Sequence, residues 1–357
     1  MSWGDLALMN KADRAFLRYL NPSPADTVVD LWYGDADLAR AVAAQVPTGQ
    51  LVLLMPDATA KTMAEHDLSG VHNVTVMVAA GAESLPVARF DLVYLAVRPY
   101  LSNARLADLL SGARRCLRPG GRLLLFASMR QGAPTLLRRA EEVFGNMQIL
   151  DKPGGTRIAR CYAPEDADAS IVGREEWEKI FTVHTRGHAF SFVSGADVFS
   201  TGELDDGTRL LLESVDVMSA DRVADLGCGY GAIGIIAARL ASAGWTTLVD
   251  TSAHAVALAQ RNIVCNEVLN ADAFVSDGLV AVRERRFDLV LSNPPLHVAR
   301  GTVERLTREA YAQLAPYGRL AYVVHKGYDA RSIVQSVFGK VTTLAETEAF
   351  RLIGANR

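Results

Sequence analysis

Short apolar runs alternate with stretches of helical periodicity along most of the chain. Four apolar runs in the second half predict strands over 223–226, 246–249, 287–291 and 319–324. Apolar residues recur at helical spacing at Val303, Leu306, Ala310, Tyr311 and Leu314, and in the first half at Leu106, Leu109, Leu110, Ala113 and Leu117. Strands that alternate with amphipathic helices are typical of a largely parallel sheet with helices on both faces. The pattern therefore predicts an α/β fold with these apolar stripes in its core.

The same pattern occurs twice, because stretches of the first half return in the same order about 195 residues later. The matched stretches are 28–34 with 223–229, 90–93 with 287–290, 117–123 with 314–320 and 143–145 with 337–339, and Asp57 is matched with Asp250. The repeat is as long as a whole domain, and a chain of 357 residues has room for two. We therefore predict two tandem Rossmann-like domains, 1–165 and 181–357, with a linker or domain entry over 166–180.

Composition places the chain among ordinary globular proteins, since 50% of its residues are hydrophobic and 22% are charged. A net charge of −3 argues against a protein that coats nucleic acid through its overall charge. The four cysteines are scattered without C-x-x-C spacing, so they predict neither a metal site nor a disulfide framework. The start of the chain lacks a signal-peptide pattern, and no apolar stretch reaches membrane-spanning length. We expect a cytoplasmic protein without a metal.

A glycine-rich loop, Asp225-Leu-Gly-Cys-Gly-Tyr-Gly231, follows the strand predicted at 223–226 and opens a helix near Ala232. Glycines permit positive φ angles and a close approach to a ligand, at the strand ends where open parallel sheets bind ligands. The letters at 229–234 also spell G-x-G-x-x-G, with Asp250 about 20 residues on, so a dinucleotide is an alternative ligand. Asp225 favours a ligand that carries an ammonium group, because its carboxylate would repel a pyrophosphate.

An Asn-Pro-Pro-Leu turn, residues 293–296, follows the strand predicted at 287–291. Its prolines fix φ and remove two backbone donors, which leaves carbonyl groups without partners. An amine conjugated to a ring or a carbonyl is a poor nucleophile, because its lone pair is delocalised. The side-chain oxygen of Asn293 and the carbonyl of Pro294 can each accept one N–H from such an amine and orient its lone pair. The turn predicts catalysis by positioning and electrostatics, without a covalent intermediate.

Together the loop and the turn resemble the class I methyltransferase superfamily, whose members bind S-adenosylmethionine. By that resemblance Asp225 and Gly227 face the methionine end of the cofactor, Asp250 binds the ribose, and Asp277 with Gly278 lies beside the adenine. The whole cofactor site it implies comprises Thr208, Asp225, Gly227, Cys228, Gly229, Gly231, Asp250, Thr251, Asp277, Gly278 and Asn293. The catalytic residues it implies are Asn293, Pro294, Pro295 and Leu296.

The segment 199–212 and the tandem layout are similar to the bacterial ribosomal-RNA guanine-N2 methyltransferase family, in which a degenerate domain precedes the catalytic one. The resemblance implies transfer to guanine N2 in ribosomal RNA. The chain departs from that family at two places. Leu296 stands where most relatives carry an aromatic residue that would stack on the base, and Val324-His-Lys326 stands where they tend to carry asparagine.

The first copy lacks the chemistry of the second. It has bulky Trp32 and Tyr33 in place of the loop's small residues, and Leu95-Ala-Val-Arg-Pro-Tyr100 in place of the Asn-Pro-Pro turn. We therefore predict a first domain that binds no cofactor. Basic residues that could contact RNA phosphates are Arg98, Arg114, Arg115, Arg138, Arg139, the run 283–286 and, near the entry of the second domain, His184, Arg186 and His188. Short basic runs are more typical of solvated faces, and the spacing of residues 184, 186 and 188 equally fits the exposed face of a strand.

The predicted partner is ribosomal RNA or a ribosomal subunit, and we expect a monomer without metal or membrane contact. Three alternatives remain. The same turn can hold adenine N6 or a glutamine amide, and an RNA-binding protein inactive in both copies would belong to a different class. A dehydrogenase is the most remote alternative.

Overall fold

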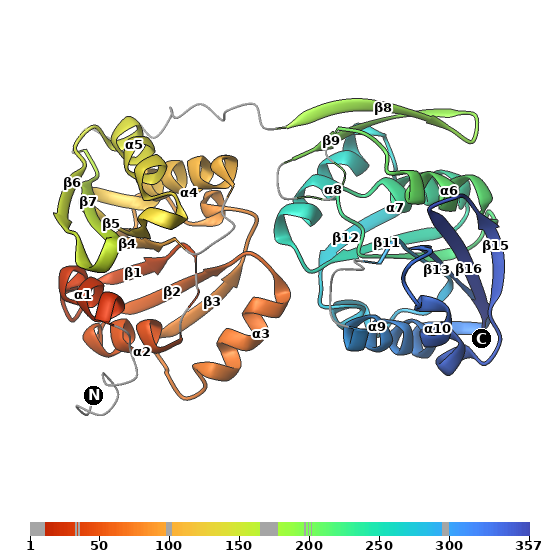
Figure 1. Ribbon diagram of the computed structural model, residues 1–357, viewed down its shortest axis with the longest axis horizontal. Coiled ribbons are helices and arrows are strands. Elements are labelled where there is room, and N and C mark those ends of the chain that lie inside the picture. Colours follow the sequence, from red (N-terminus) through yellow and green to blue (C-terminus); the bar gives the residue numbers. More distant parts are fainter. Residues whose placement is uncertain are drawn as a thin grey trace. The chain divides into compact units, whose positions relative to one another are not determined.

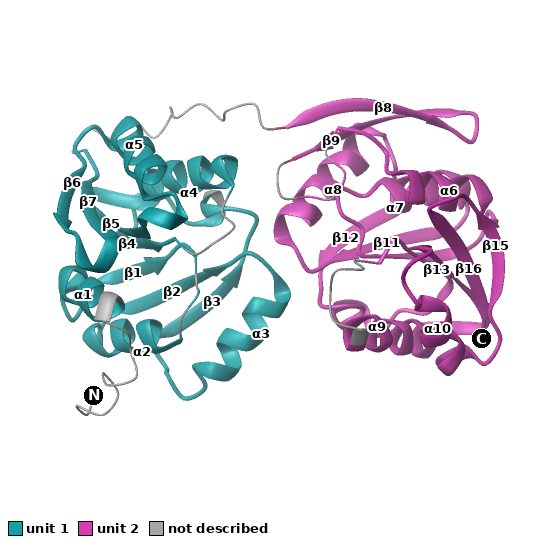
Figure 2. Cartoon of the chain, in the orientation of Figure 1, with its two compact units in different colours: residues 1–177 teal, residues 178–357 magenta. Residues whose placement is uncertain are grey.

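The computed structural model describes residues 11–32, 34, 36–97, 102–164, 178–195, 198, 200, 202–294 and 300–357. The chain divides into two compact units, Met1–Trp177 and Glu178–Arg357 (Figure 2). Each unit contains its own seven-stranded sheet. None of the described helices is both long and apolar enough to cross a membrane.

Unit 1 is an α/β sheet domain (Figure 1). Its strands are β1 Thr27–Asp30, β2 Gln50–Met55, β3 Val74–Val78, β4 Phe90–Ala96, β5 Leu117–Ser128, β6 Gln148–Asp151 and β7 Thr156–Tyr162. Its helices are α1 Lys11–Leu20, α2 Ala36–Gln45, α3 Ala58–Asp67, α4 Asn103–Cys116 and α5 Ala133–Phe144. The strands lie in the order β3-β2-β1-β4-β5-β7-β6, and β7 runs antiparallel to both of its neighbours.

Unit 2 repeats this plan. Its sheet has the order β12-β11-β10-β13-β14-β16-β15, and β16, like β7 of unit 1, runs antiparallel to both of its neighbours. The strands are β10 Arg222–Leu226, β11 Trp245–Asp250, β12 Ala271–Val275, β13 Phe287–Ser292, β14 Leu314–His325, β15 Thr342–Glu346 and β16 Phe350–Asn356. The helices are α6 Asp206–Ser214, α7 Ala232–Leu240, α8 Ala253–Cys265, α9 Arg300–Gln313 and α10 Ala330–Phe338. A hairpin of β8 Lys179–Thr185 and β9 His188–Ser194 is added to it.

Helices cover both faces of each sheet. In unit 1, α1, α2 and α3 share one apolar core with the sheet, and α4 and α5 share another. In unit 2, α6, α7 and α8 pack on one face with the hairpin, and α9 and α10 pack on the other. The predicted tandem of largely parallel sheets with helices on both faces is therefore confirmed.

The predicted stripes needed two corrections. Leu117 and Leu314 begin β5 and β14, so the helix before each strand ends one residue earlier than the apolar spacing indicated. Tyr311 is 36% exposed, because its ring packs at the surface between Phe338 and the Arg357 guanidinium.

The β8–β9 hairpin is fastened to the domain by two asparagines of α8. Asn262 is fully buried; its Oδ1 accepts the Val193 N–H, and its Nδ2 donates to the carbonyls of Val193 and Tyr230, all at 2.8 Å. One turn later, Asn266 makes the same two-way pairing with Ser191. The two side chains therefore hydrogen-bond to β9 as a neighbouring strand would.

Replacing Asn262 with alanine should destabilise unit 2 by about 2 kcal/mol, because three buried backbone groups would lose their partners. Urea denaturation followed by circular dichroism measures this loss. The matched control is Gln335→Ala on the exposed side of α10, which should leave the transition unchanged. An equally small effect of both substitutions would contradict the role given to Asn262.

Candidate functional site

Four neighbouring strands of unit 2 bring predicted site residues to one edge of the sheet. β12, β11, β10 and β13 lie side by side and run parallel, so their carboxyl ends meet at this edge. Along it follow, in this order, Asp277, Asp250, Gly227 and Asn293. This is the edge at which open parallel sheets bind ligands.

The outer side of the glycine loop is open. The N–H groups of Gly227 and Cys228 donate to the Val249 carbonyl at 2.9 and 3.0 Å, which folds the loop back over β11. Gly227 and Gly229 have φ angles of 78° and 55°, which glycine adopts without steric cost. A Cβ on Gly227 would meet no heavy atom of the described residues within 4 Å. A ligand can therefore approach the backbone here.

The inner side of the loop packs into the core. The Tyr230 ring makes edge contacts with Phe181 and Phe192 at 5.7 and 5.6 Å between centroids. Cys228 is buried, and burial raises the pKa of its thiol well above its usual value, so it is not a nucleophile. A Cβ on Gly231 would come within 3.1 Å of neighbouring side chains, so this glycine allows close packing. At residues 228 and 231, only backbone groups are therefore available for the predicted contacts with the cofactor.

Asp225 is a buried carboxyl group with one engaged oxygen. Its Oδ2 accepts the Gly234 N–H at 2.8 Å, and its Oδ1 has no partner among the described residues. Burial raises the pKa of Asp225 to about 7; the Gly234 N–H opposes this, and the Asp250 carboxylate adds to it. A cation placed beside Oδ1 would stabilise the charged form.

Asp250, the last residue of β11, ties two loops together. Its Oδ2 accepts the Gly229 N–H and its Oδ1 accepts the Ser252 N–H, both at 2.9 Å. Each carboxylate oxygen has more than one lone pair, so both can also accept a hydroxyl group. Thr251 follows directly and is half-buried.

Asn293 has a fixed amide orientation. Its Nδ2 donates to Oδ2 of Asp205 at 2.8 Å and to Oγ1 of Thr208 at 3.1 Å. Asp205 is the N-cap of α6, where its side chain also accepts the Thr208 N–H. A carboxylate can only accept, so it selects the amide rotamer with nitrogen toward α6 and oxygen directed away. None of the described residues donates a hydrogen bond to that oxygen, so it can accept the N–H of an incoming amine.

Asp205 was missed by the sequence analysis, although Asp-x-x-Thr before an apolar run is a helix-start signal. Thr208, predicted as a cofactor contact, holds Asn293 in this structure, and its contact with the cofactor stays a prediction. Sequence reasoning also missed Ser292, whose hydroxyl donates to the Leu226 carbonyl at 2.5 Å. That bond joins the turn to the end of β10, beside the glycine loop.

Pro294 ends the pairing of β13 with β14. At the equivalent position of unit 1, Val97 continues the ladder by donating its N–H to the Phe126 carbonyl at 2.8 Å. Pro294 has no N–H, so the chain leaves the sheet here. The other predicted catalytic residues, Pro295 and Leu296, lie outside the described residues.

Asp277 and Gly278 contact α9. Asp277 pairs with Arg305 at 2.5 Å, and Arg305 also pairs with Glu309. Gly278 has a φ of 63°, and a Cβ there would come within 2.0 Å of the Glu309 carboxylate. The close approach of α9 thus explains this glycine, and the adenine contact of both residues stays a prediction.

Unit 1 has different residues at the positions equivalent to Asp250, Gly227 and Asn293. β1 pairs with β2 as β10 pairs with β11, so Met55 is equivalent to Asp250. The match of Asp57 with Asp250 was therefore wrong: Asp57 caps α3 as Ser252 caps α8. Trp32, with the Arg105 guanidinium 5.8 Å from its ring, stands in place of Gly227, and Ala96 stands in place of Asn293.

Most arginines considered as phosphate contacts have structural partners. Arg114 donates to the Val143 carbonyl, and Arg115 donates to the carbonyls of Ala82 and Leu85. The alternative that Arg186 lies on the exposed face of a strand is wrong. It forms the β8–β9 turn, and its guanidinium donates to the carbonyls of Leu212, in the last turn of α6, and Val215. Arg98 lies outside the described residues.

Comparison with known proteins identifies the domain type. The family model of the methyltransferase small domain matches residues 7–160 and 189–354. The Ribosomal RNA small subunit methyltransferase C of Aliivibrio salmonicida is 28% identical over 226 residues, which cover 62% of this chain and 66% of that protein. Its counterpart in Pseudomonas paraeruginosa (strain DSM 24068 / PA7) is 29% identical over 266 residues, 72% of this chain and 78% of that protein.

A solved structure shares the fold of nearly the whole chain. It is the T. thermophilus 16S rRNA N2 G1207 methyltransferase in complex with AdoMet and guanosine, with a TM-score of 0.74 and 22% identity. The match covers 98% of this chain and 92% of that one. The family model matches once in each unit. The chain therefore belongs to the methyltransferase small domain family and carries that domain twice.

Proposed function

We propose that the chain transfers a methyl group from S-adenosylmethionine to the exocyclic N2 amine of a guanine in 16S ribosomal RNA. The observation that carries the proposal is the amide of Asn293, which Asp205 and Thr208 hold with its oxygen free to accept an N–H. The relatives named above and the guanosine in the T. thermophilus complex support the substrate. The enzyme would act in the cytoplasm as a monomer without a metal.

The residues present fit the cofactor. Asp225 precedes the open loop at Gly227 by two residues, and its buried Oδ1 has no partner among the described residues. The ammonium group of the cofactor would supply that partner, which a pyrophosphate does not offer. Asp250 would bind the ribose hydroxyls, and Asp277 and Gly278 would lie beside the adenine. When bound, S-adenosylmethionine supplies an electrophilic methyl group on its sulfonium.

The turn would orient the amine. Oδ1 of Asn293 and the Pro294 carbonyl accept its two N–H groups, which directs the nitrogen lone pair toward the methyl group. These acceptors also stabilise the positive charge that develops on the nitrogen, and the surplus proton leaves to solvent. No strong base is required, because the alkylated amine is acidic.

Labelled S-adenosylmethionine tests the proposal directly. The purified chain is incubated with small ribosomal subunits, free 16S rRNA, DNA and a protein fraction, and labelled RNA is digested to nucleosides. N2-methylguanosine in the RNA samples is the expected product. Label confined to N6-methyladenine or to protein would overturn the proposed substrate, and tight cofactor binding without any transfer would indicate an inactive RNA-binding protein.

Asp205 is expected to act as a positioning residue. Asparagine at this position can still cap α6, but it allows the Asn293 amide to rotate, since it can donate as well as accept. We expect Asp205→Asn to lower kcat roughly tenfold with unchanged cofactor affinity and melting temperature. Asp329→Asn, at the N-cap of α10, is the matched control and should leave kcat unchanged. A lower melting temperature with normal kcat in Asp205→Asn would reduce Asp205 to a structural cap.

A further inference from the structure

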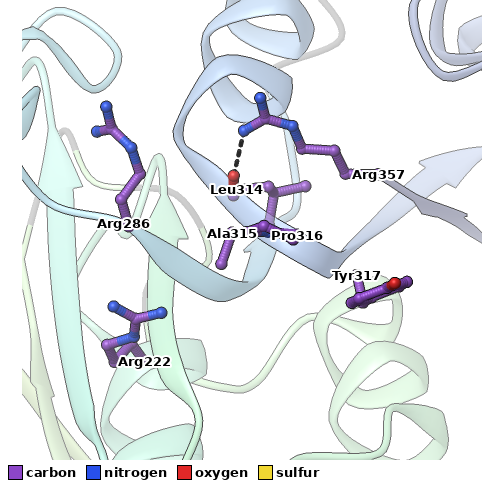
Figure 3. Close-up of a pocket in the computed structure, with 7 residues that line it drawn as sticks. All are labelled: Arg222, Arg286, Leu314, Ala315, Pro316, Tyr317 and Arg357. Atoms are coloured by element: carbon purple, nitrogen blue, oxygen red, sulfur yellow. Dashed lines mark hydrogen bonds between the residues drawn. The ribbon is translucent and has the colours of Figure 1, made fainter.

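A hollow lies at the opposite edge of the unit 2 sheet, where the strands begin. It has a volume of about 630 Å³ and is lined by Arg222, Arg286, Arg357, Tyr317 and the preceding turn, 314–316 (Figure 3). Arg222 begins β10, Arg286 precedes β13, and the turn belongs to the start of β14. The six-residue strand β13 therefore separates the hollow from Asn293, a distance of roughly 20 Å.

Two arginines that line the hollow bind backbone carbonyls and no carboxylate of the described residues. Arg286 Nη1 donates to the carbonyls of Arg283 and Arg285, at 3.1 and 2.9 Å. Arg357 Nη1 donates to the carbonyls of Ala312 and Leu314. Among the described residues, Arg222 is the one of the three that pairs with a carboxylate, that of Asp288 at 2.9 Å. Backbone carbonyls orient Arg286 and Arg357 without neutralising them.

The aromatic ring of Tyr317 is exposed to solvent. It is 91% exposed, and its φ of 65° lies in the left-handed region, which is unusual for a bulky residue. The equivalent turn of unit 1 has Gly120 there, with a φ of 71°. Both turns require a positive φ, and unit 1 meets the requirement with the residue that suits it. A strained residue without packing contacts to offset the strain points to a function for its ring.

Other positions of this edge also differ between the units. Arg222 is equivalent to Thr27, since each donates its N–H to the aspartate at the second position of the neighbouring strand, β13 or β4. Arg357 is equivalent to Ala163, since both N–H groups bind the glycine carbonyl that follows the turn. Unit 1 has Arg118 in place of Ala315, but Arg118 is paired with Asp91. Arg286 is equivalent to Arg89, so both units carry an arginine there. Unit 2 adds the Tyr317 ring and the Arg357 cation to this edge, although both units share one fold.

We propose that this hollow binds the backbone of single-stranded RNA, with one base stacked on Tyr317 and phosphates on Arg286 and Arg357. Guanidinium groups bind phosphate oxygens in a bidentate manner, and exposed aromatic rings stack on bases with little sequence preference. The inference rests on the proposed function, because it assigns a second contact to the same RNA substrate. The contact holds the RNA without touching the reacting amine.

Fluorescence anisotropy with a labelled single-stranded RNA oligonucleotide tests the hollow in the full chain. Tyr317→Gly and Arg357→Ala install the residues of unit 1, so both variants should fold. We expect Tyr317→Gly to weaken RNA binding roughly tenfold, the effect of losing one stacked base. Arg357→Ala should reduce the slope of log Kd against log salt by about 0.7.

Arg308→Ala is the control for net charge, because Arg308 is an exposed arginine of α9 paired with Glu304. It should bind RNA as the unchanged protein does. An unchanged RNA affinity in Tyr317→Gly overturns the inference, and so does an equal loss in Arg308→Ala. If the unchanged protein transfers no methyl group to rRNA, the proposed function fails, and the binding data still decide whether this hollow contacts RNA.

Discussion

An enzyme in which Asn293 is replaced by alanine is expected to lose turnover at least about 100-fold while its cofactor affinity stays the same. The loss follows because the amide oxygen, held in place by Asp205, is the acceptor that orients the target amine, and removing one preorganised hydrogen-bonding group costs about 100- to 1000-fold in kcat. Initial rates on small ribosomal subunits give kcat. Titration calorimetry with S-adenosylmethionine gives the affinity and a stoichiometry of one per chain.

Unit 1 shows that alanine is compatible with this place in the fold, since Ala96 occupies the equivalent position at the end of β4. Misfolding is therefore not the expected cause of the loss, and an unchanged melting temperature would verify this. Turnover equal to that of the unchanged enzyme would refute the role of Asn293. Two equivalents of bound cofactor would refute the prediction that unit 1 binds none.

Much of the fold was predictable because strands and helices leave local patterns. The runs at 223–226 and 287–291 correspond to β10 and β13, and the repeat correctly predicted two copies of one sheet domain. The stripes failed where the chain changes structure without a break in hydrophobicity. Leu314 is as buried in a strand as it would be in the preceding helix, so spacing alone assigns it to the helix.

The site was predictable only where its chemistry lies in one short segment. The glycine loop and the Asn-Pro-Pro turn are such segments, whereas the bond between Asp205 and Asn293 joins residues 88 positions apart. Asp57 shows the opposite error, in which similar letters at a similar spacing suggested equivalence. Strand register decides equivalence, and it aligns Met55 with Asp250.

Replacing Asp225 with asparagine is expected to stabilise the cofactor-free protein above pH 7 and to weaken cofactor binding roughly 100-fold. Burial raises the pKa of Asp225 to about 7, whereas the same residue in the unfolded chain titrates near 3.8. Between these values the folded protein holds a proton that the unfolded chain has lost. Its stability therefore falls as pH rises from about 4 to about 7, by roughly 2 to 4 kcal/mol, and then levels off.

Asparagine has no charge to desolvate, so this fall in stability should disappear, and the variant should melt above the unchanged protein at pH 8. Binding responds in the opposite way, because asparagine cannot form a charge-assisted hydrogen bond with the cofactor's ammonium group. Below pH 7 the unchanged protein should also release a proton from Asp225 when it binds the cofactor, and calorimetry in buffers of different ionisation enthalpy detects this release.

The matched control for Asp225 is Asp30→Asn, at the equivalent buried position of unit 1, which should leave cofactor affinity and proton release unchanged. A lower melting temperature of Asp225→Asn at pH 8 together with full affinity would show that Asp225 only supports the loop through Gly234. Higher stability with lost affinity would instead show that the carboxyl group is retained at a cost to the fold. A buried carboxyl group without a partner costs stability, and such a cost is typical of a site where a ligand supplies the partner.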